Sequence, residues 1–306
     1  MLRWRLISAA VILSVLLTLV WLDFQQAVFG TAGVWLLPVL LLVALLGSGE
    51  VLELMRAKQH RPLAGIVYFG NCVIPLAAAA PVFFQLADRS FPDSNPLGRF
   101  GWPLVALALF AIAVLLGETV RYRQSGTAVI DAALAIFALV YLGLLTSFWP
   151  LLRLHRGNAW GMLALLSLLV VTKVADTGAF AVGRIFGRRK MTPSLSPGKT
   201  WEGFVGGVVS ACLASWSLFH YAGPAIVGSA YVEPAISASI IYGSLLALAG
   251  MVGDLAESLL KRDMERKDSS TWLPGLGGVL DIIDAVLVAG PVAWLCWVFG
   301  LVGPGA

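Results

Sequence analysis

The sequence has few charged residues, and this shortage excludes an ordinary soluble domain. Charged residues make up only 12% of the 306 positions, whereas hydrophobic residues make up 59%. A soluble domain carries roughly 25% charged residues. The composition therefore predicts an integral membrane protein surrounded by the lipid bilayer, and no nucleic-acid partner is expected.

Cysteine and histidine are also scarce, with three residues of each kind. The cysteines lie inside apolar runs and show no paired spacing, which argues against a disulfide framework or a cysteine metal set. They are interpreted as small core residues. The histidines are scattered, so little is left for a histidine-based metal site or a Ser–His catalyst.

Long apolar runs dominate the chain. A helix that crosses the bilayer needs roughly 20 mostly apolar residues, and about nine segments meet this length. They are residues 5–23, 31–50, 63–87, 102–118, 128–150, 159–182, 202–222, 235–256 and 279–301. No convincing signal-peptide cleavage site follows the first segment, so it is counted as a span. We therefore predict an all-α integral membrane protein, a polytopic bundle of about nine transmembrane helices.

The basic residues predict the orientation, because Lys and Arg are retained on the cytoplasmic side of a membrane. Most of the 21 basic residues fall in loops that face the cytoplasm if the N-terminus is inside. The two richest of these loops lie between residues 183 and 200 and between residues 257 and 278. The expected topology is N-in and C-out, in the inner (cytoplasmic) membrane, with both loops on the cytoplasmic face.

Acidic residues of the first half lie mostly at the ends of spans. Glu50, Glu53 and Glu118 close apolar segments, and acids at helix ends are usually solvated or reach toward water. Asp131 lies one turn inside its segment. It is expected either to pair with a basic loop residue or to face a polar cavity, and the sequence does not decide between these.

Carboxylates gather around the last two spans. One helical face would carry Asp254, Glu257, Ser258 and Lys261, which are spaced i, i+3, i+4 and i+7, and the next span opens with Asp281 and Asp284. Acids at two facing helix ends with a basic loop between them indicate a site for a divalent cation and a phosphate. Glu257 has two alternatives, a metal role or a pair with Lys261.

Residues 173–203 form a second polar region. Lys173 and Asp176 are spaced to neutralise each other within a span, either as a structural ion pair or as part of the site lining. The repeat Gly183-Arg184 and Gly187-Arg188 would place two guanidinium groups on one helical face. The loop that follows carries Ser194, Ser196, Lys199 and Glu202, a set that suits a polyphosphate. It lacks the first glycine and the βαβ context of a P-loop NTPase, which we exclude.

Small residues mark the seventh span. Gly206, Gly207, Ser210 and Ala214 are expected to allow close helix packing in lipid. Such faces also permit a homodimer.

These polar blocks resemble the phosphatidate cytidylyltransferase (CDP-diacylglycerol synthase) family. The family pattern S-x-x-K-R-x(4)-K-D, P-G-H-G-G and D-R-x-D stands here as Ser258, Lys261-Arg262, Lys267-Asp268, Pro274-Gly275-Leu276-Gly277-Gly278 and Asp281-Ile282-Ile283-Asp284. An upstream block also matches, and it comprises Asp176-Thr177, Gly183-Arg184, Gly187-Arg188 and the run from Ser194 to Gly203. Residues 1–158 would then be a transmembrane scaffold half, and residues 159–306 a catalytic half of one continuous membrane domain.

The resemblance implies a nucleotidyltransferase of phospholipid biosynthesis that converts CTP and phosphatidic acid into CDP-diacylglycerol and diphosphate. It implies Mg²⁺, with a second cation plausible, held by Asp254, Asp281 and Asp284, and a catalytic set completed by Lys199 and Lys261. Substrate contacts are expected from Arg184, Arg188, Ser194, Ser196, Lys199, Glu202, Ser258, Arg262, Lys267, Gly277 and Gly278. Lining residues would be Lys173, Asp176 and Glu257.

Two positions depart from the family pattern. Leu276 stands where the family has histidine, and Ile282 where it has arginine. These departures leave a catalytically silent homologue as an alternative. Three others also stay open: a CTP-dependent enzyme making CDP-archaeol, a polyprenol or phytol kinase, and a membrane transporter with Lys173, Asp131 and Asp176 along an ion path.

Overall fold

The computed structural model describes residues 2–25, 30–92, 95–123, 126–266, 269–270 and 277–304. Of the described residues, 78% are helical. Among the described residues, the only paired strands are β1 (Lys190–Thr192) and β2 (Ser196–Thr200). The predicted all-helical class is confirmed.

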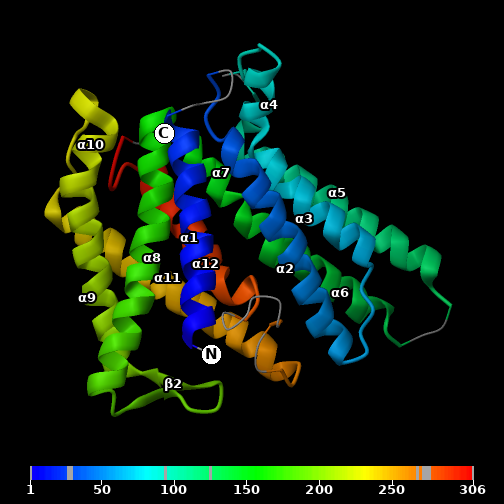
Figure 1. Cartoon of the computed structure of the whole chain (residues 1–306). Helices are drawn as coiled ribbons and strands as arrows, with labels where there is room; N and C mark the ends of the chain where they lie inside the picture. Colours follow the sequence, from blue (N-terminus) through cyan, green and yellow to red (C-terminus); the bar gives the residue numbers. More distant parts are fainter. Residues whose placement is uncertain are drawn as a thin grey trace. The chain divides into compact units, whose positions relative to one another are not determined.

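The chain divides into two compact units, and the first contains Met1–Leu151 and Asp263–Ile282. Its elements, coloured from blue to green in Figure 1, are α1 (Leu2–Gln25), η1 (Val34–Leu36), α2 (Leu37–Ala57), α3 (Ala64–Ala78), α4 (Ala80–Leu86), α5 (Gly98–Arg121), α6 (Ala128–Ala138), η2 (Leu139–Leu144) and the start of α7 (Phe148–Arg153).

The second unit contains Leu152–Arg262 and Ile283–Ala306. Its elements are α8 (Asn158–Phe186), β1, β2, α9 (Trp201–Ser217), η3 (Leu218–Ala222), α10 (Gly223–Val227), η4 (Gly228–Ala230), α11 (Ile236–Asp263) and α12 (Leu280–Val298). The first turn of α12 belongs to the first unit, and the helix continues into the second from Ile283.

Seven helices of the described chain are long and apolar enough to cross a membrane, or eight if one bent pair counts as a single span. The bent pair is α3 and α4, which meet at 68° within the predicted segment 63–87. Pro81 at the start of α4 explains the break, because proline lacks an N–H and its ring clashes with the carbonyl four residues earlier. The first predicted segment falls on α1, of which Ala10–Gln25 forms a shorter apolar helix. The protein is a multi-pass membrane protein.

Asp131 and Asn71 are buried polar residues of the first unit, and each has a hydrogen-bond partner within that unit. Asp131 Oδ1 accepts a hydrogen bond of 3.0 Å from the backbone N–H of Arg61 and lies 3.8 Å from His60 Nδ1. The loop therefore provides the partner for this aspartate, which settles the alternative left open by the sequence. Asn71 Nδ2 donates to Ser48 Oγ at 2.9 Å and links α3 to α2.

A buried polar contact joins three helices of the second unit. Ser167 Oγ on α8 lies 2.6 Å from the hydroxyl of Tyr242 on α11 and accepts from Trp297 Nε1 on α12 at 3.2 Å. All three residues are fully buried. Because buried polar groups need partners, this contact holds α8, α11 and α12 together.

Close contact between helices depends on small residues, as predicted. A Cβ atom added at Gly206 of α9 would lie 2.4 Å from Val182 Cβ on α8, and one at Gly207 would lie 3.1 Å from Ala175 O. A Cβ atom at Gly253 of α11 would lie only 2.3 Å from Asp284 O on α12. Gly253 therefore sets the approach of α11 to α12 beside the acidic residues.

We predict that Gly253→Ala destabilises the protein, because the new methyl group collides with the α12 backbone, which cannot rotate away. Overpacking of this kind costs about 1–3 kcal/mol. The measurement is the thermal unfolding midpoint of purified protein in detergent. Gly250→Ala is the matched control on the same helix, because its Cβ would meet Ala285 Cβ at an ordinary 3.5 Å. Equal midpoints for the two variants would contradict the prediction.

Candidate active site

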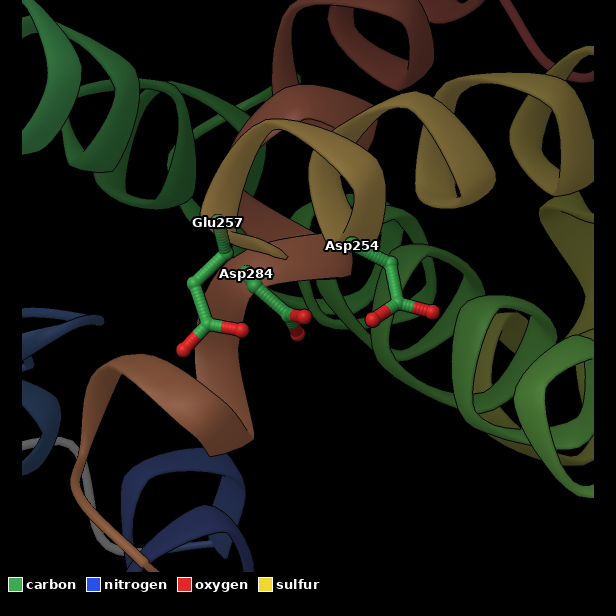
Figure 2. Close-up of side chains that lie close together, drawn as sticks. All are labelled: Asp254, Glu257 and Asp284. Carbon is green, nitrogen blue, oxygen red and sulfur yellow. The ribbon is translucent and has the colours of Figure 1, made fainter. Parts of the chain in front are cut away.

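Three carboxylates from two helices of the second unit lie together. Asp254 and Glu257 come from successive turns of α11, and Asp284 comes from α12. Each offers an oxygen, and these oxygens all lie within 4.8 Å of one another. Figure 2 shows the three side chains directed to the same side of the two helices. We call this set the acidic cluster.

The acidic cluster is unevenly exposed. Glu257 is 2% exposed and Asp284 is 5% exposed, whereas the side chain of Asp254 is 40% exposed. Like charges in such a setting repel each other and lose hydration, so they need neutralising partners. Asp254 is thus the most exposed of the three carboxylates.

Two lysines supply part of that neutralisation. Lys199 Nζ of β2 lies 2.7 Å from Asp254 Oδ2, and Lys261 Nζ lies 2.7 Å from Glu257 Oε2. The predicted i, i+4 pair of Glu257 with Lys261 is thus present, and Glu257 also belongs to the acidic cluster. The spacing of Asp254, Glu257 and Lys261 on one face of α11 is as predicted.

A further ion pair lies on α8. Lys173 Nζ is 3.3 Å from Asp176 Oδ2, as the i, i+3 spacing predicted. Asp176 also interacts electrostatically with Asp254 and Lys199. The charged residues of α8 and β2 are therefore part of the same electrostatic environment as the acidic cluster.

The loop between α8 and α9 is more ordered than the sequence suggested. Its residues form an antiparallel hairpin in which Lys190 pairs with Thr200 and Thr192 pairs with Ser196. Thr200 Oγ1 accepts from the backbone N–H of Gly203 at 3.1 Å and caps α9. In Figure 1 the hairpin lies at the ends of α8 and α9. Its strands hold Lys199 against α11.

Glu202 stabilises the turn that enters the hairpin. Its carboxylate accepts hydrogen bonds from the backbone N–H groups of Arg188 at 3.0 Å and Arg189 at 3.1 Å. At the other end of the hairpin, Arg262 Nε donates to Leu195 O at 3.3 Å. The structure thus gives Glu202 and Arg262 roles in holding the basic loop.

The expectation that Arg184 and Arg188 share a helical face is wrong. Helix α8 ends at Phe186, and Gly187 adopts an extended conformation, so Arg188 lies beyond the helix. Arg184 remains on the last turn of α8 with its guanidinium over the Phe180 ring, 5.9 Å from the centroid. Both arginines are exposed.

The remaining predicted substrate contacts differ in exposure. Ser194 is exposed, whereas Ser196 and Ser258 are half-buried. Lys267 and Leu276 lie outside the described residues.

Asp281 is engaged at the start of α12 rather than in the acidic cluster. Its Oδ2 accepts from Ser269 Oγ at 2.7 Å and from the backbone N–H of Gly278 at 2.7 Å. The backbone donors that the Gly277–Gly278 turn was expected to offer to a phosphate therefore include one that is bonded to a protein carboxylate. The bond to Gly278 links an acid in the first turn of α12 to the backbone just before the helix begins.

Sequence reasoning missed Glu50. We expected a solvated or snorkelling helix-end acid, but Glu50 is 5% exposed and accepts hydrogen bonds from the backbone N–H groups of Val279 and Leu280. Its partners lie 229 and 230 positions away, so no local pattern could reveal them. The one sequence signal is an acid within the small-residue run Gly47-Ser48-Gly49.

The acidic cluster fits a hard divalent cation by its donors. All three side chains provide carboxylate oxygens, the ligands that Mg²⁺ prefers. The two lysine ammonium groups already at the cluster show that positive charge is favourable there. Asp254, Glu257 and Asp284 are thus the residues that could hold a metal.

Taken together, the fold and the site define a multi-pass helical membrane protein with a lysine-paired acidic cluster beside a basic hairpin. The family model that matches residues 3–299 is described as the Cytidylyltransferase family. The chain belongs to this family.

Curated relatives extend over most of the chain. A phosphatidate cytidylyltransferase of Haemophilus influenzae is 30% identical over 296 residues, which cover 95% of this chain and 96% of the relative. One of Bacillus subtilis is 29% identical over 255 residues, covering 83% of this chain and 87% of the relative. One of Pseudomonas aeruginosa is 34% identical over 207 residues, covering 66% and 70%. The resemblance noted in the second half therefore extends into the first.

We predict that Lys199→Met tightens the binding of a divalent cation in the absence of nucleotide, because the ammonium group competes for Asp254. A partly exposed ion pair contributes at most about 1 kcal/mol, so we expect roughly a two- to fivefold lower dissociation constant for Mn²⁺, measured by electron paramagnetic resonance.

Lys190→Met is the matched control. It removes the same charge from the neighbouring strand, where the structure shows no carboxylate partner for Lys190 among the described residues. If both variants bind Mn²⁺ equally, the competition at Asp254 is refuted.

Proposed function

We propose that this protein transfers the cytidylyl group of CTP to phosphatidic acid, forming CDP-diacylglycerol and releasing diphosphate. The family match over residues 3–299, together with phosphatidate cytidylyltransferases as relatives over nearly the full length, carries the proposal. The acidic cluster and the basic hairpin provide groups of the kind this reaction needs.

The reaction needs no side-chain nucleophile. A phosphate oxygen of phosphatidic acid attacks the α-phosphorus of CTP, a new P–O bond forms, and the bond to the β-phosphate oxygen breaks as diphosphate leaves. The protein has to bring two anions together and stabilise the charge that develops on the leaving group. This requirement is consistent with a site rich in carboxylates, lysines and arginines but poor in histidine.

Asp254, Glu257 and Asp284 would hold Mg²⁺. When bound, the cation would neutralise phosphate oxygens and polarise the reacting phosphorus. The resemblance also assigns Asp281 to the metal, and this assignment remains a prediction beside the capping contact described above. A second cation remains part of the proposal.

The basic residues divide between the two substrates. Lys199 faces the acidic cluster from the hairpin, and with Arg184 and Arg188 it would bind the triphosphate. Lys261 and Arg262, at the end of α11, would bind the lipid phosphate. Glu202 supports this arrangement by holding the backbone of Arg188.

The site is proposed to face the cytoplasm from the inner membrane. The excess of Lys and Arg in the loops that carry the site residues supports this orientation. CTP is a cytoplasmic, water-soluble substrate and phosphatidic acid is a lipid, so a site at the ends of α11 and α12 suits both. The small-residue helix faces leave a homodimer as a further proposal.

The test compares wild-type protein with Asp284→Asn, in detergent, with phosphatidic acid, Mg²⁺ and radiolabelled CTP. We expect magnesium-dependent CDP-diacylglycerol from the wild type and a loss of about 100-fold or more in the variant, because removing one electrostatic stabiliser of a transition state has this order of effect. EDTA should abolish the wild-type activity.

Asp263→Asn is the matched control, since Asp263 is an exposed acid at the end of α11. It should retain activity. Folded wild type that forms no product would contradict the proposal and favour another lipid acceptor or a silent homologue. The variant Leu276→His with Ile282→Arg would then show whether the family residues restore turnover.

A further inference from the structure

The first turn of α12 is held by a carboxylate from α2. Glu50 Oε1 accepts from the backbone N–H of Val279 at 2.8 Å, and Glu50 Oε2 accepts from that of Leu280 at 2.9 Å. The N–H of Gly278 is bonded to Asp281. Three consecutive donors at the start of the helix therefore end on two carboxylates, all within the first unit.

Ser269 connects these two carboxylates. Its Oγ lies 3.1 Å from Glu50 Oε2 and 2.7 Å from Asp281 Oδ2. A Cβ atom at Gly278 would lie 2.4 Å from Glu50 Oε2 and 2.1 Å from Ser269 Oγ, so only glycine allows this approach. The contact is a close-fitting one, in which the backbone of α12 itself reaches the Glu50 carboxylate.

The contact of Glu50 stabilises a helix start that is weak by sequence. Helix α12 is entered through Gly277 and Gly278, residues with low helix propensity, and Gly277 has a positive φ of 86°. The four N–H groups that open any helix lack partners within it. A buried anion at this end satisfies two of them and interacts favourably with the helix dipole. Without Glu50, the turn that carries Asp281 and immediately precedes Asp284 would lose its main anchor.

We propose that Glu50 is a positioning residue for the reaction. It keeps the first turn of α12 helical, and Asp284 on the next turn is thereby presented to Asp254 and Glu257 of α11. The inference rests on the proposed function, and it gives the N-terminal half of the chain a direct part in forming the site. The role proposed for Glu50 is to hold the helix start, not to bind substrate or metal.

The test compares Glu50→Gln with Glu53→Gln. Glu53 is an exposed glutamate one turn further along α2, so it controls for the loss of one negative charge. Gln at position 50 retains the shape but replaces one accepting oxygen with a donor that faces a backbone N–H. Glu50→Asp keeps the charge with a shorter reach and should restore part of the function.

For Glu50→Gln we expect kcat to fall and the dissociation constant for Mn²⁺ to rise, each by about tenfold, the scale of losing a group that orients metal ligands. The KM for CTP should change little. Hydrogen–deuterium exchange should quicken in residues 278–285, while the thermal midpoint stays within a few degrees of that of Glu53→Gln. A purely structural role would lower the midpoint and the folded fraction without changing Mn²⁺ affinity in the folded protein.

The proposal is overturned if Glu50→Gln binds Mn²⁺ and exchanges hydrogen as Glu53→Gln does. If the proposed function is wrong, the wild type forms no CDP-diacylglycerol, and this outcome is distinct from a failure of the Glu50 proposal. In that case Mn²⁺ affinity and hydrogen exchange still decide the effect of Glu50 on the acidic cluster, since neither measurement requires turnover.

Discussion

Three carboxylates within 4.8 Å of one another are the constraint on which the second unit depends. In a helix bundle built for lipid, such a group is unfavourable unless cations or donors face it. Lys261 comes from the same helix, one turn from Glu257, but Lys199 has to be brought from a different part of the chain. The hairpin, the Thr200 cap and the Glu202 contacts with the backbone of Arg188 and Arg189 can all be understood as the means of holding Lys199 in place.

Glu50 and Asp281 form a second group of carboxylates, and backbone donors stabilise their negative charge. Glu50 and Asp281 accept hydrogen bonds from N–H groups at the start of α12 and from the Ser269 hydroxyl. The N–H groups and the dipole at a helix N-terminus stabilise an anion placed there. Along α12, Asp281 accepts hydrogen bonds at the helix start, whereas Asp284 belongs to the acidic cluster with Asp254 and Glu257.

The sequence was informative where spacing alone determines geometry. The i, i+3 and i, i+4 spacings predicted the shared face of α11 and the pairs Lys173–Asp176 and Glu257–Lys261, and apolar length predicted the helical membrane fold. It failed where the outcome depends on contacts far along the chain. Gly187 ends α8 because the chain turns into the hairpin, so Arg188 leaves the face of Arg184. Glu50 becomes a buried cap only because α12, some 230 positions away, begins beside it.

The charges of the acidic cluster link the binding of a cation to the binding of the nucleotide. Lys199 pairs with Asp254 and Lys261 pairs with Glu257, so two ammonium groups offset part of the negative charge of the three carboxylates. A divalent cation bound there, as proposed, would add positive charge and weaken the ion pair between Asp254 and Lys199. The released ammonium lies on a hairpin that also carries Arg188, Arg189 and Lys190. Metal binding would thus create the positive field that a triphosphate requires, so cation and nucleotide should favour each other's binding to the same degree.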